Sequence, residues 1–122
     1  MARFVSKPFF DASVTGVVES AITGCPCELD HFEASNSSGS DAFLQLFDAA
    51  SASDVTLGTT VPNQSYFIPG PAGATGGADR IYTRPILFEA GLAYAVTTTP
   101  TGNTSPASAI TLNAGLLPRG TR

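Results

Sequence analysis

Most of the chain consists of short segments in which hydrophobic and polar residues alternate with the two-residue period of β-strands. The clearest case is 92–99, where Leu92, Tyr94 and Val96 alternate with small residues. Turn-forming residues separate the segments at roughly ten-residue spacing. The predicted strands are residues 14–22, 27–35, 42–48, 66–68, 86–90, 92–99 and 108–114. About seven or eight short strands without a helical period predict an all-β fold, an antiparallel β-sandwich of jelly-roll or Greek-key type.

The second of these segments contains a break in the alternation. Leu29 and Phe32 are an odd number of positions apart, whereas Phe32 and Ala34 return to the two-residue spacing. A β-bulge near Asp30 and His31 would turn all three apolar side chains toward the core. We therefore interpret His31 as a bulge or rim residue and not as a catalytic base.

The segment Ala42–Asp48 is apolar on both of its faces. Leu44 and Leu46 fall on one face, and Phe43 and Phe47 fall on the other. Such a pattern is typical of a strand in a sheet that is covered on both sides. We expect the sandwich core to be one cover, and either a loop or a second subunit to be the other.

The connectors are rich in turn-forming residues. Residues 36–41 have the composition of a hairpin turn, and residues 49–60 are too small and polar to belong to the core. The short strand 66–68 lies between Pro62 and Pro69, which predicts a position at the edge of a sheet.

Residues 69–80, PGPAGATGGADR, are a low-complexity segment. They lack the Gly-Lys-Ser/Thr ending of a phosphate-binding loop and have too few Gly-led triplets for a collagen helix. The composition predicts a flexible surface loop, and an ordered contact loop is the alternative. Arg80 and Arg84 are expected to flank a loop.

The length and composition indicate one folded domain. The chain has 122 residues, of which 43% are hydrophobic, and this is enough for a single buried core. Residues 1–12 are apolar but interrupted by Pro8, so we expect an extended N-terminal arm and not a helix. Residues 13–116 are assigned to the sandwich, and residues 117–122 to a basic C-terminal tail. The arm could fold back on its own domain or reach a neighbouring subunit, and we favour the neighbour.

The chain carries few charges, and their distribution is uneven. Only 13% of residues are charged, about half the usual share, which favours burial against other copies or a larger particle. The net charge is −4, and the basic residues are not clustered as a nucleic-acid-binding face requires. The acidic residues could form a solvated sheet face, or basic ends such as Arg3 and Arg119 could bind acidic surfaces of neighbouring subunits. No apolar run is long enough for a signal peptide or a membrane span, so we expect synthesis in a cytoplasm and no membrane partner.

The residues that could carry chemistry are sparse. Cys25 and Cys27 are too close for an unstrained internal disulfide, so we expect two free, partly buried thiols. With His31, the only histidine, they supply at most three metal donors, and we predict neither a metal nor a cofactor. Glu28 and Glu33 belong to a group of acids expected on a solvated face. We therefore predict that the protein is not an enzyme.

The sequence also resembles a known class of proteins. The resemblance covers most of the chain after residue 20 and runs through GCPCEL, ASNSSGSDAFLQLFDAA, TLGTTVPNQSYFIP, a Gly-rich loop and ILFEAGLAYAVTTTPTGNTSPASAITLNAGL. These strand patterns are similar to small β-sandwich virion proteins encoded by tailed bacteriophages and prophages. The resemblance carries no catalytic signature and no residue-level function.

The resemblance implies a structural component of the virion, made in the host cytoplasm. The first expectation is a capsid decoration (cement) protein that contacts the major capsid protein and other copies of itself, as a trimer. A neck or tail component, or a module that binds a receptor or glycan, is the alternative. The absence of Trp and the scattered Tyr residues weaken a sugar-stacking site. The interface candidates from the sequence are Arg3, Phe4, Phe9, Phe10, Phe43, Phe47, Arg119 and Arg122.

Overall fold

The computed structural model describes residues 7–118, and within this range the chain forms eight β-strands. One short 3₁₀ helix, η1 (Ala52–Asp54), accompanies them, and no helix in the described range is long and apolar enough to cross a membrane. The strands are β1 (Lys7–Val14), β2 (Glu19–Ile22), β3 (Cys27–Asn36), β4 (Ala42–Asp48), β5 (Gln64–Ile68), β6 (Gly76–Phe88), β7 (Leu92–Thr97) and β8 (Ile110–Pro118).

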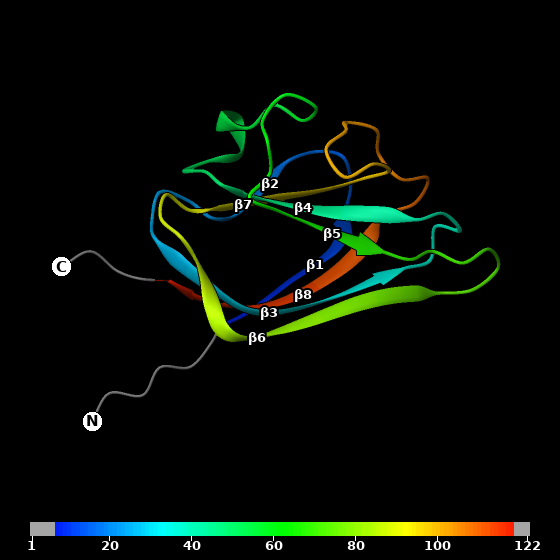
Figure 1. Cartoon of the computed structure of the whole chain (residues 1–122), viewed down its shortest axis with the longest axis horizontal. Helices are drawn as coiled ribbons and strands as arrows, with labels where there is room; N and C mark the ends of the chain where they lie inside the picture. Colours follow the sequence, from blue (N-terminus) through cyan, green and yellow to red (C-terminus); the bar gives the residue numbers. More distant parts are fainter. Residues whose placement is uncertain (1–6, 119–122) are drawn as a thin grey trace.

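The strands form two four-stranded antiparallel sheets that pack face to face (Figure 1). Sheet A has the order β1-β8-β3-β6, and sheet B has the order β2-β7-β4-β5. Pairing is nested along the chain, because β1 pairs with β8, β2 with β7, β3 with β6 and β4 with β5. This is the wrapping of an eight-stranded jelly roll, and it confirms the predicted fold class.

The main core lies between the two sheets. Alternate side chains point inward, as in Ile110 and Leu112 of β8, which are buried while Asn113 is exposed. The remaining space within the core includes an apolar void of about 10 Å³, too small for a ligand. The buried residues of this cluster are Val14, Cys27, Leu29, Phe32, Ala34, Ala42, Leu44, Leu46, Ile68, Phe88, Leu92, Tyr94, Val96, Ile110, Leu112, Ala114 and Leu116.

The predicted bulge in β3 is confirmed. The pairing of β3 with both β6 and β8 shifts register between Leu29 and His31. The shift turns Leu29, Phe32 and Ala34 to the same side, and all three are buried. In the pairing with β8, Asp30 is the one extra residue, and it accounts for the irregular spacing in the sequence.

The outer face of sheet B is covered by the chain itself. Phe47 is 1% exposed and packs in a second cluster with Val55 and Ala93, so a loop provides the second cover expected for β4. Gln45, on the same face, donates from Nε2 to Thr97 Oγ1 at 2.5 Å and to the Gly102 carbonyl at 3.2 Å. Residues 49–63 and 98–109 thus form a third layer, seen above sheet B in Figure 1.

One predicted strand near the start of the chain is divided in the structure. The segment 14–22 was expected as one strand, but it contains the end of β1, a bend and β2. Gly16 forms the bend and donates from its backbone N–H to Ser105 Oγ at 2.7 Å. A Cβ at position 16 would lie 2.4 Å from the same oxygen, so only glycine allows this close approach. The β-branched residues on both sides concealed the bend.

Residues 37–41 connect β3 in sheet A to β4 in sheet B, so the predicted hairpin is wrong. Asn36 is buried and fixes this corner, because its Nδ2 donates to the carbonyls of Ser40 at 2.9 Å and Ile68 at 3.1 Å. Its Oδ1 accepts a hydrogen bond from the Ser38 backbone N–H at 2.9 Å. Turn-rich composition predicts that the chain changes direction, but it does not distinguish a hairpin from a crossing between sheets.

The Gly-rich segment is only partly a loop. β6 begins at Gly76, so Arg80 and Arg84 lie within a strand and do not flank a loop. Gly77 pairs with Ser35, and a Cβ on it would lie 2.6 Å from the Ala34 carbonyl oxygen. Glycine is needed here for close strand packing. From composition alone, the same glycines predicted a flexible loop.

Three further expectations from the sequence differ from the structure. Residues 7–12, within the expected arm, form most of β1 and pair with β8 of the same chain. β8 continues to Pro118, into the segment expected as a tail. The connector 49–60 was expected to contribute nothing to a core, but its Ala49 and Val55 are buried against Phe47.

Candidate interaction surfaces

No disulfide joins Cys25 and Cys27, in agreement with their spacing. Cys27 is buried at the start of β3, whereas Cys25 is half-buried. Burial, and to a smaller extent negative charge from Cys25, Asp48 and Glu28, raises the pKa of the Cys27 thiol to about 11. A thiol with this pKa is protonated at neutral pH, so Cys27 is poorly suited to nucleophilic attack or metal binding.

His31 lies beside the bulge of β3, in agreement with its interpretation as a bulge residue. Its Nδ1 is 3.4 Å from a carboxylate oxygen of Asp30. Within residues 7–118, no three His, Cys, Asp or Glu side chains are grouped so that they could hold a metal ion. Cys25, Cys27 and His31, the donors considered from the sequence, therefore do not converge.

Two tyrosines that are distant in the sequence meet at one side of the sandwich. One residue of β3, Asp30, faces the four residues 82–85 of β6, which form a large bulge. Tyr82 lies in this bulge, and its hydroxyl hydrogen-bonds to that of Tyr66 on β5. Tyr66 donates its hydroxyl proton to Gln64 Oε1 at 2.8 Å, so Tyr82 is the donor in the bond between the two tyrosines. Burial, and the hydrogen bond that Tyr82 donates to Tyr66, raise the pKa of Tyr82. The tyrosine pair closes the gap between the edges of the two sheets.

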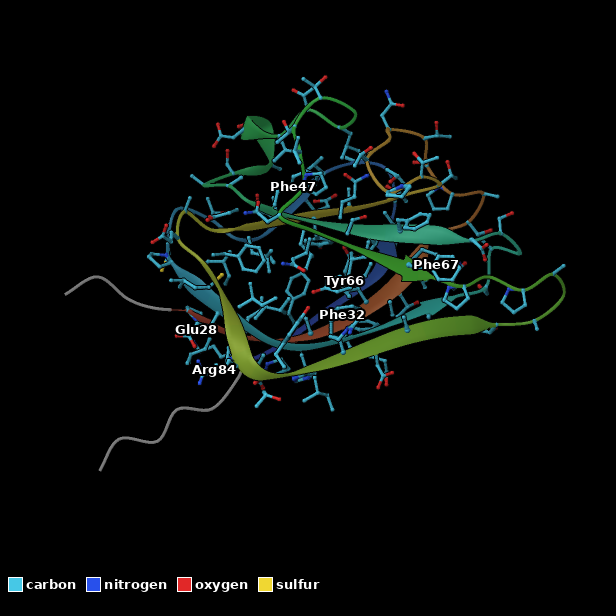
Figure 2. The ribbon with its side chains drawn as sticks, viewed as in Figure 1. Glu28, Phe32, Phe47, Tyr66, Phe67 and Arg84 are labelled. Carbon is cyan, nitrogen blue, oxygen red and sulfur yellow. The ribbon has the colours of Figure 1, made fainter. Side chains whose placement is uncertain are left out.

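The ring of Tyr66 is occupied by neighbours within the chain. Phe32 lies 4.9 Å from it between ring centroids, with the two rings tilted by 50°. Figure 2 shows both residues between the two sheets. The Arg80 guanidinium lies 5.2 Å from the centroid of the Tyr66 ring, in a cation–π contact. Tyr66 and Tyr82 thus lie together, whereas Tyr94 packs on Phe9. Tyr66 offers little free surface for stacking on a sugar.

The outer surface of sheet A is exposed, and we call it the acidic face. Large apolar side chains stand on it beside carboxylates: Phe10 is 62% exposed, Ile81 is 79% exposed and Leu87 is 50% exposed. No loop of the described residues crosses this surface in Figure 1, in contrast to the outer surface of sheet B. The acidic face consists of Phe10, Glu28, Asp30, His31, Glu33, Asp79, Ile81, Leu87 and Asn113.

The strand register sets two rows of residues across the acidic face. In one row, Phe10 pairs with Asn113, Asn113 with Glu33, and Glu33 with Asp79. In the adjacent row, His31 pairs with Ile81. Glu33 and Asp79 are exposed carboxylates in directly opposed positions, an arrangement that destabilises a sheet. Neither forms an ion pair with another residue of the described range.

A partly exposed aromatic pair lies on sheet B. Phe43 of β4 and Phe67 of β5 are cross-strand partners, with ring centroids 5.5 Å apart. Phe67 is 51% exposed, and Figure 2 shows it on the β5 edge of the molecule. This pair is smaller than the acidic face and carries no charge.

The eight interface candidates from the sequence fall into three groups. Phe10 is exposed on the acidic face, and Phe43 is half-buried beside Phe67. Phe9 packs edge to face on Tyr94 at 5.5 Å, and Phe47 is buried beneath its own loop, so Phe47 presents no surface to a partner. The other four, Arg3, Phe4, Arg119 and Arg122, lie outside the described residues.

The edge strands of the sheets are poorly suited to pairing with another chain. β1 contains Pro8, β6 contains Pro85 within its bulge, and β5 lies between Pro62 and Pro69, which confirms its predicted edge position. β2, the remaining edge strand, has only four residues. Proline and short length are the usual means of preventing edge pairing, so any protein partner is expected at a face.

Comparison with known proteins adds no assignment. No protein-family model matches the chain. No curated protein matches it either.

Sequence reasoning missed the central residues of the acidic face. Asp79 and Ile81 were placed in a loop, so their pairing with Glu33 and His31 was not foreseen. Residues 78–81, Ala-Asp-Arg-Ile, do not alternate between apolar and polar side chains, so the two-residue period that marks the other strands is absent here.

Proposed function

We propose that this protein is a structural component of a bacteriophage virion, a capsid decoration protein that stabilises the head through contacts with the major capsid protein and with copies of itself. The exposed acidic face carries this proposal. Phe10, Ile81 and Leu87 would bury apolar surface on contact with a partner, and the blunted edges direct that contact to the face.

Two other observations support the proposal. The sequence resembles phage virion proteins, and jelly rolls occur in viral capsid proteins as well as in lectins. The fold alone does not choose between these functions. The occupied ring of Tyr66 favours the capsid role over sugar binding, because a glycan platform needs an accessible aromatic surface.

Quantitative mass spectrometry of intact virions tests the proposal. We expect the protein at high copy number, in a fixed ratio to the major capsid protein. Particles that lack it should assemble but lose resistance to heat or low salt, and addition of purified protein should restore it. Recovery at only a few copies per particle would contradict a decoration role and favour a neck, tail or receptor-binding protein.

A further inference from the structure

The charges are divided unequally between the described residues and the two segments that flank them. Residues 7–118 contain all ten acidic residues and three basic ones, Lys7, Arg80 and Arg84, for a formal net charge of −7. The flanking segments contain Arg3, Arg119 and Arg122 and no acid, for a charge of +3. The described domain and its flanking segments are therefore electrostatically complementary.

On the acidic face, two carboxylates form a position that suits a positively charged group. Glu33 and Asp79 repel each other across the β3–β6 pair, so a cation placed between them would relieve an unfavourable contact. Arginine suits such a position, because its guanidinium can bind two carboxylates at once. Ile81, in the neighbouring row, would contribute apolar contact to the same ligand.

Residues 1–6, MARFVS, match this surface better than residues 119–122, RGTR, which contain no large apolar side chain. In an extended segment, residues two apart project to the same side and are about 7 Å apart. Arg3 and Val5 have this spacing, and so do the Glu33–Asp79 and His31–Ile81 rows of the sheet. We infer that residues 1–6 of a second copy of the chain bind the acidic face, with Arg3 between Glu33 and Asp79 and Val5 against Ile81.

The geometry of β1 favours a second copy over the same chain. Lys7 pairs with Leu116 on the outer edge of sheet A, whereas Asp79 and Ile81 lie on β6 at the opposite edge. To reach them, the chain would have to reverse at Lys7. Pro8 restricts Lys7 to extended conformations, so this reversal is disfavoured.

A contact of this kind joins two different surfaces of the same protein. Such heterologous contacts close into rings when the rotation between neighbours allows it. The inference thus gives a physical basis for the trimer expected of a decoration protein. It deepens the proposed function and rests on it for its biological setting.

Charge exchange in the full-length protein tests the inference by analytical ultracentrifugation. We expect Arg3→Glu, and separately Glu33→Arg with Asp79→Arg, to weaken self-association by at least about tenfold. The protein carrying all three substitutions should recover most of the association. Arg122→Glu and Asp54→Arg are matched controls that should leave association unchanged, and circular dichroism checks folding.

Several outcomes would overturn the inference. Failure of the triple variant to recover association would show that Arg3 does not meet the two carboxylates. Loss of association with Arg122→Glu alone would assign the contact to the other flanking segment. A thermal shift of a monomer on Arg3→Glu would show binding within one chain. If the wild-type protein is monomeric yet abundant in virions, this inference fails while the proposed function stands.

Discussion

The two sheets have the same number of strands, but the chain treats their outer faces in opposite ways. Sheet B is covered by the chain's own loops, and no charged residue occurs in 55–78 or 90–118, which include β5, β7 and most of this cover. Among residues 7–118, no loop covers sheet A, which displays carboxylates with large apolar side chains between them. We therefore propose the outer face of sheet A as the surface that contacts a partner.

Removal of Phe47 should have the largest effect on the covered sheet. Phe47→Ala should lower the free energy of unfolding by about 3–5 kcal/mol, because the ring is buried between sheet B and its loop. Phe67→Ala, on the same sheet but half exposed, should cost about 1 kcal/mol or less. Urea denaturation of both variants measures the difference. Equal losses would mean that the loop layer does not form a real core.

The buried thiol of Cys27, on the inner face of β3, should make stability depend on pH. Cys27 on the inner face has a pKa of about 11, against 9.0 for an ordinary thiol. Both states are protonated below pH 9, so the contribution of Cys27 to stability is complete there. Between pH 9 and 11 the unfolded chain loses this proton while the folded chain keeps it, so stability falls by up to about 2–3 kcal/mol.

Denaturation curves recorded from pH 8 to 11 test this. Cys27→Ala should make stability less dependent on pH in this range, whereas Cys25→Ala should leave most of the dependence in place. An unchanged slope in Cys27→Ala would show that the thiol ionises equally in both states.

Relief of the repulsion on the acidic face should stabilise the isolated domain slightly. Asp79→Asn should raise the free energy of unfolding by about 0.2–1 kcal/mol at low salt, with a smaller gain at high salt. Asp54→Asn, on the loop layer, is the control and should have no comparable effect. A loss of stability in Asp79→Asn would show that the carboxylate already has an attractive partner.

The smallest effects on folding are expected from substitutions of two equally exposed side chains on opposite sides of the molecule. Ile81 is 79% exposed on the acidic face, and Val61 is 80% exposed on the loop layer. Replacement of either by Thr should change stability by no more than about 0.5 kcal/mol. Only Ile81→Thr should weaken self-association, and ultracentrifugation distinguishes the two. Equal effects on association would remove the distinction between the faces.

Local patterns predicted much of the fold. The strands predicted from alternation at β7 and β8, the two-sided burial of β4 and the bulge at Asp30 all depend on neighbours in the sequence, and all are confirmed. β7 is in addition buried on both faces. The corner at Asn36 and the start of β6 were missed, because their residue types are determined by contacts with distant segments. The opposition of Glu33 and Asp79 depends on strand register across the jelly roll, which no local pattern encodes.

The nested pairing of the strands has a consequence for the order in which the protein can be made and folded. β8 lies between β1 and β3 in sheet A, yet it is the last of these strands to leave the ribosome. Until then β1 has no partner strand in sheet A, and β3 can pair only with β6. Sheet A therefore cannot be completed until β8 has been synthesised. A chain interrupted before Ile110 would expose its core strands to aggregation or to chaperones.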